Sequence, residues 1–404
     1  MDKLAILGGK PVRNNKIYYG KQYIDDADVK AVSEALRSEL ITCGPKVEEF
    51  EQELCKITGA KYAVVLANGT AALHAAMFAA GIGKGDEVIT SAITFAASAN
   101  CALYVGAKPI FADIDLDTWN ISPEDIEKKI TKATKAIVAV DFAGQACDYT
   151  KIKEICIKHN LLLIEDAAHS IGSKHNGVPV GNIADMTTFS FHPVKTITGG
   201  EGGAILTNNK EYYQKLMLFR THGITRDEEF LNLKDAGSWY YEQIELGYNY
   251  RITDFQAALL ISQFRKLPAF AARRREIVEY YNSVFGDYDL VTIQKEISAS
   301  DTTRHLYILR LNLDKLKATR REIYDAMYAE NVCCNVHYIP VYYHPYYVKM
   351  GYKKGLCQNA ESLYEEIITI PLYYSMTYDD VNDVITAIKK VLEYYRKQQE
   401  DNLI

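Results

Sequence analysis

The chain has 404 residues, of which 46 are basic and 52 acidic, giving a formal net charge of −6. A chain of this length buries one large core with a smaller one, or two of similar size, which excludes a lone binding module. The mildly acidic balance argues against a nucleic-acid surface and against an anionic membrane as partner, because both need a basic face. We therefore expect a small-molecule partner.

The cysteines and the N-terminus both indicate a cytoplasmic protein. The eight cysteines form no C-x-x-C pair and no spacing suited to a metal, and several lie within apolar or helical runs. Such residues act as small buried hydrophobic groups in a reducing compartment. The apolar run Leu4 to Leu7 is too short for a signal peptide, and no segment reaches a membrane-spanning length. We expect a soluble cytoplasmic protein without a metal.

Two helices are expected between residues 25 and 59. The second places Val47, Phe50, Leu54 and Ile57 on one face and ends at Gly59. Short apolar strands then alternate with helical stretches, and strands that are apolar throughout are typical of a parallel sheet covered by helices on both faces. The five expected strands span residues 62–67, 87–91, 108–114, 135–142 and 161–166.

Two further strands, 186–191 and 203–208, are joined by a short loop that carries Lys195. So short a reversal predicts antiparallel pairing. A lysine held between apolar strands loses solvation, which favours its neutral, nucleophilic form. A solvated loop lysine is the simpler interpretation of this motif alone. Ser190 can bond a phosphate. The glycines that permit tight turns beside a ligand are Gly199, Gly200, Gly202 and Gly203.

A second, smaller α/β unit is expected after the sheet. A long basic helix begins near residue 255, is interrupted at Pro268, and is expected to bridge the two domains. A strand at 305–313 and an amphipathic helix at 379–396 follow it. We expect a large domain over residues 1–260, including the N-terminal segment, and a small C-terminal domain over 261–404.

Ligands of such sheets gather beyond the carboxyl ends of the strands. One strand end is followed by the segment NGTAAL (68–73). There a helix begins, and Gly69 and Thr70 provide free backbone N–H groups and a hydroxyl. That arrangement suits a phosphate, although an ordinary capped helix has the same sequence. At another end, Phe95 precedes a helix of small residues, where its ring could stack on a flat cofactor or fill the core.

A further strand end carries acidic residues. The apolar strand ends in Glu165 and Asp166, with His169 one turn later. A carboxylate at a buried strand end requires a partner. A pyridinium nitrogen would supply one, because the carboxylate keeps the ring protonated and able to accept electron density. The alternative is a carboxylate that only caps the next helix. Together these motifs occur in the chain order of the large fold of pyridoxal-phosphate (PLP) enzymes.

The motifs resemble those of the DegT/DnrJ/EryC1/StrS family of sugar aminotransferases, over nearly the whole chain. The resemblance implies a PLP-dependent transferase of fold type I, similar to aspartate aminotransferase, with a large, mostly parallel sheet domain. Within the family, SFHPVKTIT followed by GEGGA is most similar to enzymes that aminate C4 of a UDP-linked 4-keto-6-deoxy-N-acetylhexosamine in pseudaminic acid biosynthesis. The other matching stretches are 40–50, 68–73, 165–170, LFRTHG (218–223), GYNYRITDFQAALL (247–260) and HYIPVY (337–342).

The resemblance also implies residue roles. Lys195 would form the Schiff base with PLP and move the proton between cofactor and substrate carbon. Asp166 would hold the ring nitrogen, Phe95 would stack on the ring, and His169 would lie near the ring oxygen. The phosphate ligands would be Gly69, Thr70 and Ser190, joined by Asn249 from a second subunit.

The implied reaction takes an amino group from L-glutamate to a nucleotide-sugar ketone, in a homodimer with shared active sites. His337 also suits a structural histidine. The N-terminal segment and the insertion at 227–243 do not define the substrate. The sugar-nucleotide contacts implied by the family are Tyr19, Glu39, Leu40, Ile41, Thr42, His337 and Tyr338.

Several alternatives stay open. Enzymes that aminate C3 or C4 of other UDP or dTDP sugars, or carbocyclic ketones, would carry nearly the same cofactor motifs. A dehydratase on this scaffold has histidine at the Schiff-base position, and Lys195 argues against it. A DNA-binding regulator would need a helix-turn-helix and a basic face, and neither is visible. A structural protein would leave Asp166, Lys195, Ser190 and Asn249 together unexplained.

Overall fold

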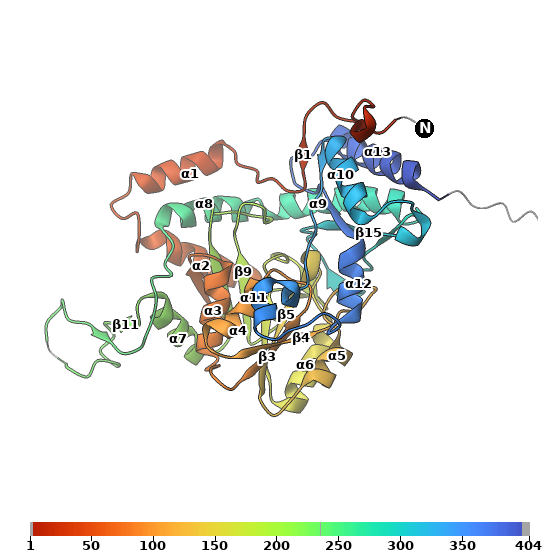
Figure 1. Ribbon diagram of the computed structural model, residues 1–404. Coiled ribbons are helices and arrows are strands. Elements are labelled where there is room, and N and C mark those ends of the chain that lie inside the picture. The colour runs from red at the N-terminus through yellow and green to blue at the C-terminus, as the bar shows by residue number, and fades with distance from the viewer. Residues whose placement is uncertain (1–2, 235, 398–404) are drawn as a thin grey trace, which may run out of the picture.

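The computed structural model describes residues 3–234 and 236–397. Its centre is a seven-stranded sheet in the order β2-β10-β9-β6-β5-β3-β4 (Figure 1). Paired strands are parallel except at β10, which is antiparallel to both β2 and β9, and this confirms the predicted reversal. The strands, all within a residue or two of prediction, are β2 (Tyr62–Leu66), β3 (Glu87–Ser91), β4 (Lys108–Ala112), β5 (Thr134–Val140), β6 (Leu162–Asp166), β9 (Met186–Ser190) and β10 (Gly203–Thr207).

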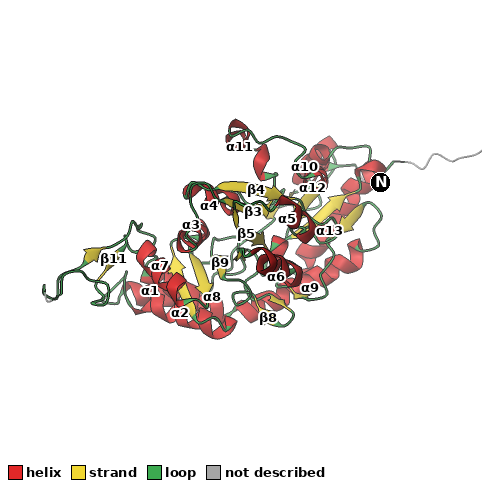
Figure 2. Cartoon of the chain, turned by 90° about the horizontal axis from the view of Figure 1, so that it is seen from below, coloured by secondary structure: helices red, strands yellow, loops and turns green. Residues whose placement is uncertain are grey.

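Helices cover both faces of this sheet (Figure 2). Successive side chains of β2 point to opposite faces of the sheet. Val65 packs in the core on one face, and Val64 and Leu66 pack in the core on the other. Each strand is therefore buried on both sides, as its continuous apolar sequence predicts. One face carries α2 (Pro45–Thr58), α5 (Pro123–Lys129), α6 (Tyr149–His159) and α8 (Asp254–Arg265), and the other carries α3 (Gly69–Ala79), α4 (Ala97–Tyr104) and α7 (Lys210–Arg220).

Helix α2 confirms the predicted second helix but corrects its buried face. Phe50 and Leu54 are fully buried, whereas Ile57, expected on the same face, is 48% exposed. With 3.6 residues per turn, the inward position after Leu54 falls on Thr58, whose hydroxyl bonds the Leu54 carbonyl at 2.8 Å. Before α2, α1 (Asp26–Leu36) packs on α8 through the buried Asp28, which accepts a hydrogen bond from Ser262 at 2.6 Å.

A separate core, here called the C-terminal core, lies in the C-terminal part of the chain. There the antiparallel sheet β13-β15-β17 packs with three helices and with Leu4 and Ile17 from the N-terminal segment. Ile17 belongs to β1 (Ile17–Tyr18), which pairs in parallel with β16 (Val332–Cys333). A domain boundary at residue 260 stays a prediction. The elements of this core are β13 (Val291–Ile293), β15 (Tyr307–Leu311), α10 (Arg320–Ala329), β17 (Ile367–Ile370) and α13 (Tyr378–Tyr395).

Helix α9 (Leu267–Phe285) connects the two parts of the chain. Its first turn contains Pro268, directly after α8 ends, as the predicted interruption requires. Phe270 packs in the core on the sheet face that carries α8, and Tyr281, near the other end of α9, packs in the C-terminal core. Within the described residues, no helix combines the length and the apolar character needed to cross a bilayer. All eight cysteines are free, and six of them are buried.

Short elements complete the fold. The insertion after α7 forms an arm with the hairpin β11 (Ile224–Thr225) and β12 (Glu242–Gln243), which projects from the body in Figure 1. The remaining elements are β7 (Lys174–His175), β8 (Val178–Pro179), β14 (Ser300–Asp301), α11 (Pro345–Lys349) and α12 (Gln358–Glu366).

Candidate active site

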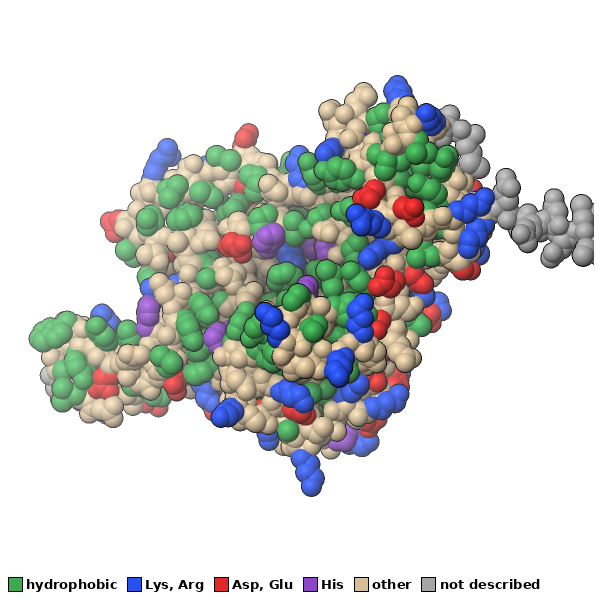
Figure 3. Space-filling model, viewed as in Figure 1, with side chains coloured by type: hydrophobic (Ala, Val, Ile, Leu, Met, Phe, Trp, Pro, Cys, Tyr) green, Lys and Arg blue, Asp and Glu red, His purple; other side chains and the backbone are tan. Residues whose placement is uncertain are grey.

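A cavity of about 1160 Å³ lies beyond the carboxyl ends of β5, β6 and β9. Figure 3 looks into this hollow, with histidine side chains around it. Its walls come from the starts of α3 and α4, the loop between β9 and β10, and the segment 335–339 of the C-terminal part. Pockets for one small molecule usually measure roughly 300–1,000 Å³, so this cavity has room for a cofactor and a substrate together.

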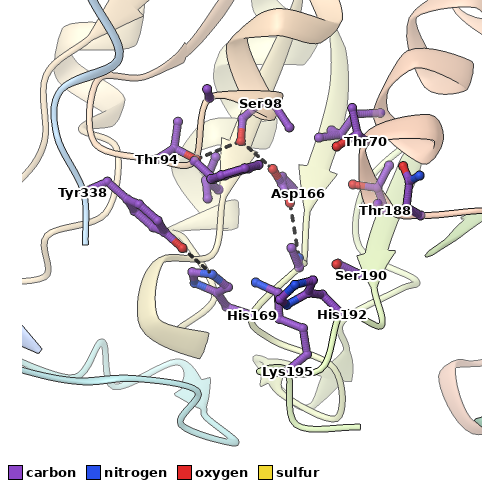
Figure 4. A pocket seen from close by; sticks show the side chains of 18 of the residues that line it. Thr70, Thr94, Ser98, Asp166, His169, Thr188, Ser190, His192, Lys195 and Tyr338 are labelled. Carbon is purple, nitrogen blue, oxygen red and sulfur yellow. Dashed lines mark hydrogen bonds between the residues drawn. The ribbon is translucent and has the colours of Figure 1, made fainter. Parts of the chain in front are cut away.

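Asp166, the last residue of β6, lies in the floor of the cavity and is only 4% exposed. Its Oδ2 accepts a hydrogen bond from Ser98 Oγ at 2.6 Å, and its Oδ1 accepts one from the Ala168 N–H at 3.2 Å (Figure 4). Burial raises the pKa of Asp166, and the Ser98 hydrogen bond is the largest influence opposing that rise. Each carboxylate oxygen retains a free acceptor position for a further donor.

Lys195 is half-buried in the loop between β9 and β10 and faces the same cavity. The loop is tightly closed, because the Phe191 carbonyl accepts hydrogen bonds from Thr198 Oγ1 at 3.0 Å and from the Gly199 N–H at 3.1 Å. Burial lowers the pKa of the Lys195 amine to about 8, against the attraction of Asp166. Near neutral pH a useful fraction of the amine is therefore neutral and nucleophilic.

The start of α3 approaches Ser190 closely. Asn68 caps the helix, its side chain accepting a hydrogen bond from the Ala71 N–H at 2.8 Å. The Gly69 and Thr70 N–H groups have no partner within the helix, because they belong to its first turn. A Cβ added at Gly69 would lie 2.8 Å from Ser190 Cβ, so only glycine permits this approach. Backbone donors and a hydroxyl thus meet at a positive helix terminus, which suits a phosphate.

A group of buried imidazoles stands beside Lys195. His169 Nε2 lies 3.1 Å from the Tyr338 hydroxyl, and the centres of the His169 and His305 rings are 4.4 Å apart. Burial, and the nearby Lys195 amine, hold the pKa of His169 well below its usual value, and burial does the same for His305. His169 Nδ1 is buried and has no hydrogen-bond partner among the described residues. These rings are neutral at physiological pH.

The structure brings most of the residues expected in the site to one cavity. Phe95 is 62% exposed there, with its ring open to a ligand. Asn249 and the loop 39–42 do not line the cavity of their own chain and are exposed. The predicted residues that line the cavity are Tyr19, Gly69, Thr70, Phe95, Asp166, His169, Ser190, Lys195, His337 and Tyr338.

Other cavity residues were missed from the sequence. Ser98 and Thr94 could have been predicted, since both lie close to Phe95 at a strand end, in the segment TFAAS. His192 could also have been predicted, because it lies three residues before Lys195. His305 could not, because its segment is typical of a strand and only the tertiary fold brings it beside His169.

These residues fit PLP. Gly69 lets the α3 terminus approach the Ser190 hydroxyl, Asp166 offers acceptor positions to a ring nitrogen, and Lys195 presents an amine to the same cavity. The unpartnered nitrogen of His169 and the exposed ring of Phe95 also suit a polar, flat ligand.

Comparison with known proteins gives a consistent result. The DegT/DnrJ/EryC1/StrS aminotransferase family matches residues 22–389. The UDP-4-amino-4,6-dideoxy-N-acetyl-beta-L-altrosamine transaminase of Campylobacter jejuni subsp. jejuni serotype O:23/36 is 38% identical, over 94% of this chain and 99% of that protein. Helicobacter pylori PseC, an aminotransferase of pseudoaminic acid biosynthesis, superimposes with a TM-score of 0.87 at 31% identity, over 94% of this chain and 100% of that chain.

The PMP form of the putative sugar aminotransferase Spr1654 from Streptococcus pneumoniae matches equally well. Its TM-score is 0.87 at 31% identity, over 94% of this chain and 98% of that chain. Since these matches extend over almost all of both chains, the fold, the cofactor and the class of reaction apply to this protein as a whole. The chain belongs to the DegT/DnrJ/EryC1/StrS aminotransferase family and is a PLP-dependent sugar aminotransferase.

Proposed function

We propose that this enzyme transfers the amino group of L-glutamate to C4 of a UDP-linked 4-keto-6-deoxy-N-acetylhexosamine, in the biosynthesis of pseudaminic acid or a related surface glycan. The observation that carries the proposal is one cavity of about 1160 Å³ holding both Lys195 and Asp166, with volume left for a sugar nucleotide. The extent of the similarity to the C. jejuni transaminase supports the sugar and the position aminated.

Bound PLP supplies an electron sink for the carbon that gains or loses nitrogen. The Asp166 carboxylate holds the proton on the ring nitrogen, which keeps that sink effective. The backbone N–H groups of Gly69 and Thr70 and the Ser190 hydroxyl bind the phosphate. Phe95 would stack on the ring.

Lys195 holds and moves the proton. Its amine would hold the bound cofactor and, when free, would take a proton from or give one to the reacting carbon. A pKa of about 8 suits both duties, because the amine gives and takes a proton with little energetic cost near neutral pH. His169 would lie near the ring oxygen as a neutral imidazole, with its orientation restrained by Tyr338 at 3.1 Å.

The sugar nucleotide enters beside Tyr19, His337 and Tyr338. The rings of Tyr19 and His337 are 5.0 Å apart, and His337 Nδ1 lies 2.9 Å from the Thr369 hydroxyl, so this wall is held in place. Burial lowers the pKa of His337 to about 3, which leaves a neutral imidazole to hydrogen-bond a sugar hydroxyl. The loop 39–42, which does not line the cavity of its own chain, is proposed to contact the nucleotide at the outer edge.

The working enzyme is a homodimer with shared sites. Among the described residues lining the cavity, Lys195 is the one lysine or arginine, yet the ligands carry a phosphate, a diphosphate and carboxylates. Further cations, and Asn249 as a phosphate ligand, are supplied by a second subunit. The apolar arm supports this arrangement, since it exposes residues that favour burial, namely Phe230, Leu233, Trp239, Tyr241 and Leu246. The reducing cytoplasm is the compartment that suits eight free cysteines.

The test is the absorbance of the purified protein with PLP, followed through both half-reactions. The band of lysine-bound cofactor should bleach with L-glutamate and return with a UDP-4-keto-6-deoxy-N-acetylhexosamine. A return with a dTDP-linked sugar or a 3-keto sugar, but not with this compound, would contradict the proposed substrate and favour the alternative nucleotide sugars. A band that does not respond to glutamate would contradict the proposed donor.

A further inference from the structure

The hydroxyl groups of Ser98 and Thr94 form a chain of hydrogen bonds that ends at Asp166. Both residues lie on the segment that also carries Phe95. Ser98 Oγ lies 2.6 Å from Asp166 Oδ2, and Thr94 Oγ1 lies 2.7 Å from Ser98 Oγ (Figure 4). The relative exposure of Thr94 is 3%, and that of Ser98 is 1%. Solvent therefore competes little with these bonds, and each is stronger than it would be at the surface.

The direction of the bonds follows from the carboxylate. An ionised carboxylate only accepts hydrogen bonds, so the single hydrogen of the Ser98 hydroxyl must go to Asp166. Ser98 Oγ is then free to accept the hydrogen of Thr94. Two donors in series point toward the negative charge, and each polarises the next.

The backbone holds this pair in place. Ser98 lies in the first turn of α4, where its N–H donates to the Phe95 carbonyl at 3.2 Å. Its short side chain leaves the hydroxyl little freedom, because the residue is fixed by the helix start. One turn thus supplies both the exposed Phe95 ring and the donor to Asp166. A hydroxyl serving only the helix would bond to its own backbone, and that of Ser98 does not.

We propose that Ser98, backed by Thr94, is a positioning residue that keeps the Asp166 carboxylate ionised and aimed at the ring nitrogen of PLP. The inference rests on the role proposed above for Asp166. It explains how an acid whose pKa is raised by burial stays charged in the floor of a cavity, since the Ser98 bond most strongly opposes that rise. Ser98 acts through Asp166 alone.

The test compares the binding of two cofactors to the apoprotein. PLP has the ring nitrogen, and 1-deaza-PLP carries a C–H in its place, so Asp166 can hold only the first. Ser98→Ala should weaken PLP binding about tenfold, the effect of one hydrogen bond to a charged group. Binding of the deaza analogue should change less than about twofold, because that analogue makes no bond to Asp166 for Ser98 to support.

The matched control is Thr90→Val, a near-isosteric loss of another buried hydroxyl. Thr90 lies on β3, and its Oγ1 donates to the Val138 carbonyl at 3.0 Å, with no contact to Asp166. This variant should affect the two cofactors equally. Should Ser98→Ala not fold, Thr94→Val carries the test, with a loss of about twofold for PLP alone, because it weakens the Ser98 bond without removing it.

Three outcomes would overturn the proposal. Unchanged PLP binding in Ser98→Ala would mean that the hydroxyl contributes nothing to Asp166. Equal losses for PLP and the deaza analogue would indicate a structural disturbance only. A wild-type protein that binds the two cofactors equally would refute the role of Asp166 itself and with it this inference, whereas either of the first two outcomes, in a protein that prefers PLP, would refute the Ser98 role alone.

Discussion

Replacing Gly69 with alanine tests the proposed phosphate site directly. Gly69 begins α3 without a positive φ, and at such positions alanine normally favours the helix by about 1 kcal/mol. Here the new Cβ would lie 2.8 Å from Ser190 Cβ and 3.2 Å from Ser190 Oγ. Carbon atoms in ordinary contact are about 3.5–4.0 Å apart, so the helix start and Ser190 must separate by roughly 1 Å.

The expected result is a folded protein with weak cofactor binding. The movement occurs at the edge of a cavity, so the gain in helix propensity and the strain largely cancel, and the midpoint of thermal unfolding should change by less than about 3 °C. In the proposed site, however, the phosphate would bond both the α3 N–H groups and Ser190. Losing one charge-assisted hydrogen bond costs about 1.5–3 kcal/mol, which corresponds to roughly 10- to 100-fold in the dissociation constant of PLP.

The assay is a titration of the apoprotein with PLP, followed by absorbance. Gly83→Ala is the matched control, because a Cβ there would meet no atom closer than the Val105 carbonyl oxygen at 3.9 Å. That variant should bind PLP like the wild type. If Gly69→Ala also binds PLP as tightly as the wild type, the close approach of α3 to Ser190 does not form the phosphate site, and the reasoning is refuted.

Three further predictions concern Lys195 and one buried ion pair. Lys195→Ala should abolish transamination with an unchanged circular dichroism spectrum, and measurable turnover would exclude its assigned role. Because only the neutral amine attacks PLP, the rate of cofactor capture by the apoprotein should rise with pH to a midpoint near 8, the lowered pKa of Lys195, and a midpoint above 10 would contradict the effect of burial. Arg220→Met should lower the free energy of unfolding by about 3 kcal/mol in a denaturant titration, since Arg220 pairs with the largely buried Glu51 at 2.5 Å. The exposed pair of Lys215 and Glu211 on the same helix is the control, and Lys215→Ala should cost less than about 0.5 kcal/mol; equal losses would show that burial is not decisive.

Local sequence predicted the sheet well, because the burial of a central strand on both faces requires a continuous apolar run. The strands around Asp166 and Lys195 were recognised for that reason, and the short loop after β9 implied the antiparallel strand. The exposure of Ile57 was not predicted, because the spacing of apolar residues gives only the face of a helix, and tertiary packing decides which positions on that face are covered.

The candidate site follows partly from the sequence and partly from the tertiary structure. The sequence by itself determined the chemistry, since a helix start at Gly69, a strand-end acid and a loop lysine in this order have few other uses. Only the tertiary structure decided which residues support them. Tyr338 and His305 reach His169 across more than a hundred residues of chain. The Ser98 hydroxyl meets Asp166 because α4 begins beside the end of β6. Such contacts follow from the packing of distant elements, which no local pattern encodes.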